Sequence, residues 1–317
     1  FFSLHPAKVM DYIGKYLTPA FLVFLFLLIG ISVIKPMGSF GEPNGAYTNL
    51  AFITGFKEGY NTMDALASLA FGIVVINAIK GQGITRSKDI ARATLKSGIF
   101  AMTLMMLIYG LITYMGASSV VAIGTFENGG QIFSAVAKHY FGPFGAILLA
   151  MIIVLACLKT SIGLITACSE FFHDLLPKVS YQRFVLLLCI VSFTIANFGL
   201  NNIIQFAVPV LMFLYPLSII LILLTLISPL FGNQQSVYAA SIAMTFFVSF
   251  FDGYSALVAN LPNINNPLFN SVTSIYVEHL PLYDIGLGWI LPAFIGAIIG
   301  YILPKAHLPV KKYQKEL

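Results

Sequence analysis

Long apolar stretches recur from one end of this chain to the other, and they constrain its fold more than any other feature. Most of them approach the ~20 residues that an α-helix needs to cross a bilayer at about 1.5 Å per residue. We expect such helices at 17–36, 60–80, 91–116, 143–172, 183–199, 202–228, 234–251 and 285–303. The sequence therefore predicts an all-α membrane protein, a polytopic helical bundle forming a single transmembrane domain over residues 1–317.

The composition agrees with a membrane protein and excludes several functions. Hydrophobic residues make up 58% of the chain and charged residues 9%, whereas soluble proteins carry roughly 25% charged residues. The net charge of +5 does not indicate nucleic-acid binding, because the basic residues lie in short loops and at the C-terminus. The sequence has no Walker-type phosphate-binding run, so we expect no ATP hydrolysis. Three cysteines in apolar segments argue against a disulfide framework.

The charges in the loops predict the orientation of the chain. Basic residues cluster after the second helix, after the fourth helix and in the C-terminal tail, which places these parts in the cytoplasm under the positive-inside rule. They are Lys80, Arg86, Lys88, Arg92 and Lys96, then Lys178 and Arg183, then Lys305, Lys311, Lys312 and Lys315. The opposite loops, which contain among others Lys57, Glu58, Asp252, Glu278 and Asp284, are expected outside the cell.

Two further segments carry local predictions. The stretch Gly129–Phe141 is amphipathic and too short to span, so it is either an interfacial helix that could act as a lid or an ordinary loop helix. The segment 202–228 contains Pro209 and Pro216, and we expect the helix to bend at both.

The segment 59–83 combines an apolar helix with a polar start. A Gly-containing run, Gly59–Met63, precedes the carboxylate of Asp64 at membrane depth. A charged side chain at the bilayer centre costs at least ~2.5–3.5 kcal/mol, so it is seldom present without a function. Unwound backbone at this depth is tolerated where it lines protein or a wet cavity, and broken helices of this kind form the substrate sites of secondary transporters.

Three motifs, in order along the chain, resemble one known family. They are Gly59-Tyr60 with Thr62-Met63-Asp64 and Asn77-Ala78; Leu155-Ala156-Cys157, Thr160, Gly163-Leu164 and Ser169-Glu170-Phe171-Phe172; and Ala196-Asn197-Phe198-Gly199-Leu200, Val208-Pro209-Val210-Leu211 and Tyr215-Pro216. The chain resembles the bacterial branched-chain amino acid carriers, the branched-chain amino acid:cation symporter family, over nearly its whole length.

The resemblance implies a fold and a function. The fold would be leucine-transporter-like, of the APC superfamily, with twelve helices; the eight expected here would be helices five to twelve, and the N-terminal helices would be absent. The function would be uptake of leucine, isoleucine and valine across the bacterial inner membrane by sodium symport with alternating access. Sodium would be the coupling ion, with no other cofactor and no obligate protein partner. The C-terminus would be cytoplasmic, and the chain would not be an enzyme.

The resemblance places the substrate at the break before residue 65. The implied contacts are Tyr60, Asn61, Thr62 and Met63. The ends of half-helices and freed backbone groups can bind the charged ends of an amino acid, and Tyr60 and Met63 could line a pocket for its branched side chain. Asp64 could contact the substrate ammonium, cap the helix that follows, or pair with a basic side chain.

The helix at 143–172 contains the second group of candidates. Sodium prefers hard oxygen ligands, and the resemblance places a coupling sodium at the hydroxyl pair Thr160-Ser161, although hydroxyls also bond back to the helix backbone. Lys159 lies mid-helix: it could form a structural pair with Glu170 or another acid, or it could take part in coupling or gating as a cation. Small residues on one face of this helix, such as Gly163, equally suit close helix packing.

Two rival functions remain from the sequence. A proton-coupled or exchange-type amino acid transporter of the same fold would give Lys159 a direct role in coupling. A membrane protein of another class, such as an intramembrane enzyme or a receptor, would need for catalysis a paired set such as two aspartates at membrane depth, and the sequence offers none. A channel would be expected to have a filter-like repeat or charged rings, which are also missing from the sequence.

Overall fold

The computed structural model describes residues 2–4, 12–43, 45, 47–261 and 266–303. Within these ranges every regular element is helical. The chain divides into two compact units, the first formed by residues 1–43 and 69–197 and the second by residues 44–68 and 198–317. Helix α4 (Asp64–Gly81) is shared: its first five residues belong to the second unit and the rest to the first.

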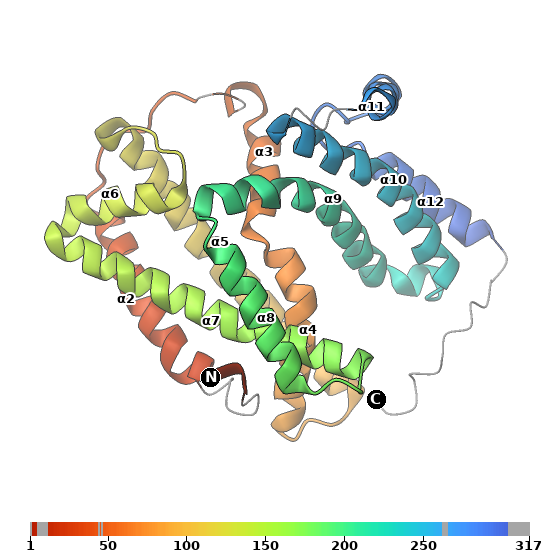
Figure 1. The fold of residues 1–317 in the computed structure, drawn as a ribbon, viewed down its shortest axis with the longest axis horizontal. Coiled ribbons are helices and arrows are strands. Elements are labelled where there is room, and N and C mark those ends of the chain that lie inside the picture. Colours follow the sequence, from red (N-terminus) through yellow and green to blue (C-terminus); the bar gives the residue numbers. More distant parts are fainter. Residues whose placement is uncertain (1, 5–11, 44, 46, 262–265, 304–317) are drawn as a thin grey trace. The chain divides into compact units, whose positions relative to one another are not determined.

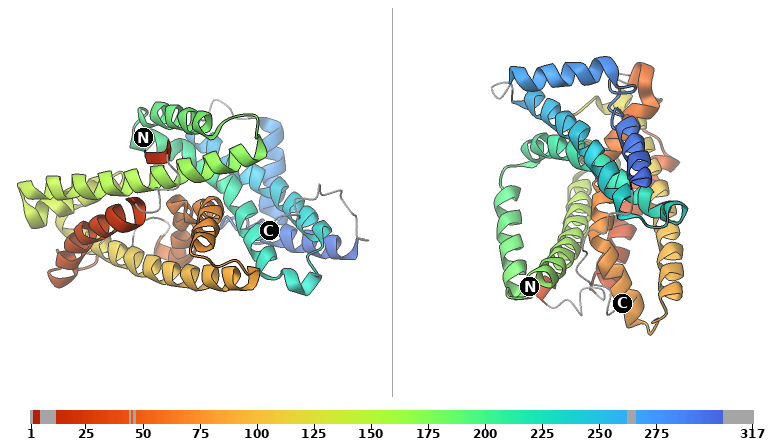
Figure 2. Two further views of the ribbon diagram at one scale, coloured as in Figure 1. Left: turned by 90° about the horizontal axis from the view of Figure 1, so that it is seen from below. Right: turned by 90° about the vertical axis from the view of Figure 1, so that its right-hand side faces the viewer.

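The first unit packs long helices around an apolar core. Its elements are α2 (Thr18–Ile34), the larger part of α4, α5 (Ser87–Ile123), α6 (Gly129–Phe141), α7 (Pro143–Leu175) and α8 (Tyr181–Ala196). Helix α2 lies alongside α7 (Figures 1 and 2). Leu28 of α2, Met115 of α5, Val136 of α6 and Leu149 of α7 are buried together, so four helices contribute to one core.

The second unit is built around α10. Its elements are α3 (Tyr47–Glu58), the 3₁₀ turn η3 (Gly59–Thr62), α9 (Leu200–Leu226), η4 (Ser228–Phe231), α10 (Gln235–Asn260), α11 (Pro267–His279) and α12 (Ile290–Ile302). Helix α10 packs along both α9 and α12, and α11 follows it (Figure 1). Figure 1 also shows that α9 curves, as expected for a helix that continues through Pro209 and Pro216, which cannot donate backbone hydrogen bonds.

Small residues bring α12 against α10. A Cβ atom at Gly296 would lie 2.6 Å from the Ala240 carbonyl oxygen, so only glycine allows this approach. One turn further, the Ser236 hydroxyl donates to the Gly300 carbonyl at 2.6 Å. The spacing of the two glycines is the small-x-x-x-small pattern that lets membrane helices pack closely without a hydrophobic driving force. The pair α10–α12 is therefore held by backbone proximity as well as by hydrogen bonds.

The helices agree with the sequence-based expectations in most places. Six described helical segments are long and apolar enough to cross a membrane, and α8 and α12 are shorter apolar helices that correspond to the expected 183–199 and 285–303. That all eight cross the bilayer stays a prediction. The helix expected at Gly129–Phe141 is confirmed with the same bounds.

Two expectations about helices were incomplete. The helix expected at 234–251 continues to Asn260, and α11, at Pro267–His279, was not predicted at all. The orientation rests partly on Lys305, Lys311, Lys312 and Lys315, which lie outside the described residues. The cytoplasmic location of the C-terminus therefore stays a prediction.

Candidate functional site

The break expected before residue 65 is present. Helix α3 ends at Glu58, the turn η3 follows, and α4 begins at Asp64. Between them Met63 adopts the left-handed conformation, with φ 58° and ψ 12°. Its carbonyl accepts the first bond of α4, from the Ala67 amide at 2.9 Å. The chain therefore starts a new helix at this point, with the positive end of its dipole at the break.

Local hydrogen bonds hold the polar residues of the break. The Thr62 hydroxyl donates to the Gly59 carbonyl at 2.7 Å, and the Asn61 amide donates to the Glu58 carboxylate at 2.7 Å. Asp64 occupies the first turn of α4, where a negative side chain is favoured by the helix dipole whether or not a ligand is present. Its position suits both the capping and the ammonium-binding interpretation.

Tyr60 is the buried member of the predicted substrate residues, and it stacks on Tyr215 of α9. The ring centroids are 4.4 Å apart and the rings are 15° from parallel. The two residues are 4% and 3% exposed. The Tyr60 hydroxyl is buried without a hydrogen-bond partner, whereas the buried Tyr215 hydroxyl lacks a bond of standard geometry but lies within reach of the Thr62 hydroxyl and of the backbone of Met63 and Ala65. A buried, unpaired hydroxyl such as that of Tyr60 is uncommon, because it loses its bonds to water without replacing them. The pair therefore offers the Tyr60 hydroxyl to a ligand.

The Tyr215 hydroxyl points at the start of α4. It faces the Thr62 hydroxyl and the backbone of Met63 and Ala65. Tyr215 thus lies at the same helix end as the predicted contacts, and sequence reasoning did not assign it a role. The one sequence signal for Tyr215 is the pair Tyr215-Pro216, which belongs to a motif of the family resemblance. That motif does not indicate that Tyr215 contacts a segment about 150 residues earlier in the chain.

The remaining candidates lie in the first unit, on α7. Thr160 and Ser161 are exposed, in the middle of a continuous helix. Lys159 is half-buried, and its ammonium lies over the Phe21 ring of α2, 4.2 Å from the ring centroid. A cation over an aromatic face is an electrostatically favourable contact.

The prediction that Lys159 forms a structural pair with Glu170 is wrong. Eleven residues of one helix separate their positions by about 16 Å, which is too far for the side chains to meet. Among the described residues no carboxylate forms an ion pair with Lys159, and the aromatic ring of Phe21 takes that place.

The small residues of α7 have a packing role. A Cβ atom at Gly163 would lie 2.5 Å from Cε1 of Phe71 in α4, so glycine makes room for that ring. Ala167, one turn on, is 1% exposed. Two hydroxyls that sequence reasoning missed, those of Thr166 and Ser169, are buried in the same half of the helix without a standard hydrogen-bond partner. Polar oxygens in α7 are therefore more numerous than the pair Thr160-Ser161 suggested.

Comparison with known proteins identifies the family. The model of the family described as "Branched-chain amino acid transport protein" matches residues 1–307. This chain belongs to that family. It is similar to the branched-chain amino acid permeases BrnQ of Bacillus subtilis (strain 168), at 42% identity over 95% of this chain and 67% of the relative, and of Lactobacillus delbrueckii subsp. lactis, at 46% over 93% and 66%.

A third relative is the branched-chain amino acid transport system 2 carrier protein of Pseudomonas aeruginosa, 38% identical over 95% of this chain and 67% of the relative. The chain thus spans about two thirds of the length of the curated relatives it matches. The family consists of transport proteins rather than enzymes, so the resemblance found in the sequence is confirmed and the intramembrane enzyme is set aside. No solved structure matches the chain.

Proposed function

We propose that this chain takes part in the uptake of leucine, isoleucine and valine, by sodium symport with alternating access. The observation that carries the proposal is the stacked tyrosine pair at the break, with the unpartnered Tyr60 hydroxyl and with the Tyr215 hydroxyl beside the N-terminus of a half-helix. Membership of a family of branched-chain amino acid transport proteins supports the substrate class.

The substrate carboxylate would bind at the start of α4. The backbone N–H groups and the dipole of a helix N-terminus favour an anion there, and the Tyr215 hydroxyl adds a donor at the same place. Asp64, in the first turn, is positioned to accept from the substrate ammonium. The faces of the Tyr60 and Tyr215 rings supply apolar surface for a branched side chain. Asn61 and Thr62 hold the turn through their local bonds.

Sodium would use oxygen ligands of α7. Thr160 and Ser161 remain the proposed ligands, because adjacent hydroxyls halfway along a membrane helix offer hard donors without an added charge. This assignment stands on the residue type and depth, and on the resemblance to the family.

A proton-coupled carrier is the second candidate, and Lys159 favours it. Its ammonium lies in an apolar helix over the Phe21 ring, and among the described residues it has no carboxylate partner. Lys159 would then take up and release the coupling proton in place of sodium.

Uptake of labelled leucine into proteoliposomes separates these functions. The carrier is reconstituted at the full length of its relatives, and a sodium gradient and a proton gradient are imposed in turn. Unlabelled isoleucine and valine serve as competitors, with lysine as the control competitor. Sodium-driven uptake blocked by the two branched competitors supports the proposal. Uptake driven by protons alone supports the second candidate, and no uptake under either gradient contradicts both.

A further inference from the structure

Helix α11 of the second unit has no part in the proposed function. It has 13 residues, Pro267–His279. At about 1.5 Å per residue it reaches about 20 Å, which is too short to cross a bilayer. In Figure 1 it is seen end-on while α10 and α12 run across the view, so it crosses that pair rather than continuing it. Since α10 is long and apolar enough to cross a membrane, the length and direction of α11 favour a position along the bilayer surface.

Aromatic contacts determine which side of α11 faces α10. The Phe269 ring lies against that of Tyr254, with the ring centroids 4.8 Å apart. Two turns further on, Tyr276 meets Phe251 edge to face at 5.4 Å. At the start of the helix, the Asn266 amide donates to the Tyr254 hydroxyl at 2.7 Å. Contacts near both ends therefore hold the rotation of α11 about its own axis.

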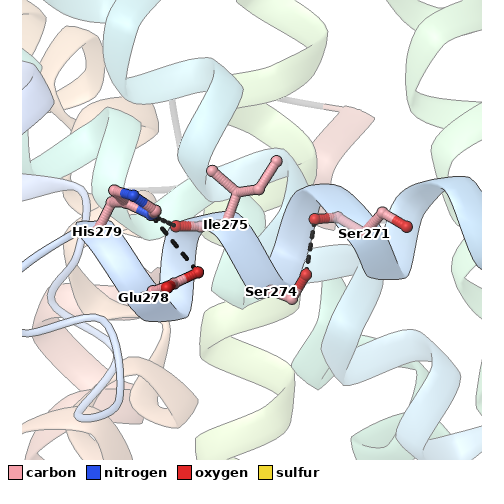
Figure 3. Close-up of polar contacts among 5 residues, drawn as sticks. All are labelled: Ser271, Ser274, Ile275, Glu278 and His279. Carbon is pink, nitrogen blue, oxygen red and sulfur yellow. Dashed lines mark hydrogen bonds and ion pairs between the residues drawn. The ribbon is translucent and has the colours of Figure 1, made fainter.

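The sides of α11 that point away from α10 are of two kinds. Leu268 and Ile275, called the apolar flank below, are two turns apart on one side of the helix and are 78% and 53% exposed. Ser271, Ser274 and Glu278 share another side, which is polar. Figure 3 shows the Ile275 side chain projecting away from Ser274 and Glu278. An exposed apolar flank beside a polar side is the pattern of a helix that lies in a membrane interface.

The charges of α11 indicate what kind of contact it makes with a bilayer. The helix contains no Lys or Arg. Its Glu278 carboxylate lies 4.0 Å from Nδ1 of His279, which also meets the Ile275 carbonyl at 3.1 Å (Figure 3). Clusters of Lys and Arg are what attract anionic lipid headgroups. A contact of α11 with lipid would therefore depend on its apolar side chains.

We propose that α11 is an interfacial helix that rests on the bilayer, with the side chains of Leu268 and Ile275 inserted among lipid molecules. Lipid is the occupant of the apolar flank because α11 packs on α10, whose own exposed side chains, such as Phe247 at 59%, face lipid when the helix spans. Apolar burial at the boundary between headgroups and acyl chains drives the insertion. Through its aromatic contacts, α11 then ties α10 to the membrane surface.

Spin labels around α11 test the proposal in the full-length carrier, reconstituted in phosphatidylcholine vesicles. The native cysteines, which form no disulfide, are first changed to serine: Cys157, Cys168 and Cys189. Single cysteines are then introduced as Leu268→Cys and Ile275→Cys, with Ser274→Cys on the polar side of the same helix as the control. The measurement is the collision rate of each label with oxygen, which concentrates in lipid, and with a water-soluble nickel chelate.

The two sides of the helix should give opposite results. We expect the labels at 268 and 275 to collide more with oxygen than with nickel, at depths of about 5–10 Å into the headgroup and acyl boundary. The label in Ser274→Cys should collide more with nickel. Replacing part of the phosphatidylcholine by phosphatidylglycerol should leave these depths unchanged, because α11 has no Lys or Arg for an anionic headgroup.

Three results would overturn the interfacial helix. Labels at 268 and 275 that collide mainly with nickel would place the apolar flank in water. Labels that neither reagent reaches would show that protein covers it, either another segment of the full-length carrier or a second copy. Insertion that requires phosphatidylglycerol would replace apolar burial by electrostatic attraction. Uptake is not measured, so the proposed function and the interfacial helix fail or stand separately.

Discussion

The broken helix of the second unit and the continuous helix α7 of the first unit present polar groups in opposite ways. At the break, Met63 turns the chain, so the backbone N–H groups at the start of α4 are left without helical partners. In α7 the helix runs from Pro143 to Leu175, and its backbone groups in the middle are used internally. A ligand at the break meets backbone dipoles, whereas a ligand at α7 depends on side chains such as Thr160. Under the proposed function, an anionic group would bind at the first and a cation at the second.

At the broken helix, substitution of Tyr215 is expected to have the largest effect on leucine uptake. Tyr215→Ala should lower leucine uptake about a hundredfold, because it removes a stacked ring worth about 0.5–1.5 kcal/mol together with a hydroxyl whose bond to a charged group is worth about 1.5–3 kcal/mol. Tyr215→Phe keeps the ring and should raise KM about tenfold. KM and Vmax are measured in proteoliposomes, with Tyr301→Phe, 58% exposed on α12, as the control. Unchanged kinetics in Tyr215→Phe would remove its hydroxyl from the site.

Asp64 distinguishes a ligand contact from a helix cap. Asp64→Asn should raise the leucine KM about tenfold or abolish uptake in a folded protein, since a charged partner of the ammonium is lost. Asp89→Asn is the matched control, because Asp89 is exposed in the first turn of α5 and has the same relation to a helix dipole. An equally small effect of the two substitutions on KM would leave Asp64 as a cap.

Substitutions of Thr160 and Ser161 test the proposed sodium site on α7. Thr160→Val and Ser161→Ala should each raise the sodium concentration for half-maximal uptake about fivefold, the cost of one oxygen ligand at about 1 kcal/mol. The leucine KM at saturating sodium should change little. Thr194→Val on α8, whose hydroxyl bonds back to Ile190, is the control. If the sodium dependence is unchanged in both variants, the site is elsewhere, and the buried hydroxyls of Thr166 and Ser169 are the next to replace.

Gly163 separates packing from ligand binding on α7. Gly163→Ala should lower the stability of the detergent-solubilised protein by about 1–3 kcal/mol, because the added methyl overlaps the Phe71 ring. Gly98→Ala on α5 has open space at its Cβ and should be neutral or slightly stabilising. The measurement is the thermal unfolding midpoint. A midpoint for Gly163→Ala at or above that of the starting protein would contradict the packing role.

Substitution of Lys159 is expected to have the smallest effect on stability and uptake. Lys159→Met removes a cation from the Phe21 ring and should cost about 0.5–1 kcal/mol of stability, with the ion dependence of uptake unchanged. Lys138→Met, exposed on α6, is the control. Ion dependence is measured as uptake against sodium concentration and against external pH. A loss of pH dependence in Lys159→Met alone would transfer the coupling role from sodium to protons.

The sequence reveals the break but not what covers it. A polar run with Asp64 inside an apolar stretch is visible in a single window of residues, so the position of the break could be predicted. The stacking of Tyr60 on Tyr215 depends on how α9 packs against η3, and no local pattern contains that information. The helix α10 was ended too early because Asp252 and Gly253 look like a loop, although the helix continues to Asn260. Burial against α9 outweighs this local preference: a Cβ at Gly253 would lie 2.9 Å from the Pro209 carbonyl oxygen.

Sequence reasoning also placed two charged residues, Lys57 and Asp252, in loops. Both lie in helices of the second unit, α3 and α10. No local sequence pattern marks Gly286, although the space at its Cβ position holds the Lys57 side chain. Pairs formed by distant segments are therefore what the sequence conceals most.

The left-handed backbone of Met63 has a consequence for the choice of residue. A side chain in that conformation costs about 1 kcal/mol or more, and glycine would avoid the cost. Methionine at this position, where the residue is 41% exposed, forgoes that gain in stability and keeps a flexible, polarisable thioether at the break between α3 and α4. Selection for stability alone would favour glycine there. Under the proposed function, the thioether would offer a surface able to adjust to more than one branched side chain, and the chain would keep it at that cost.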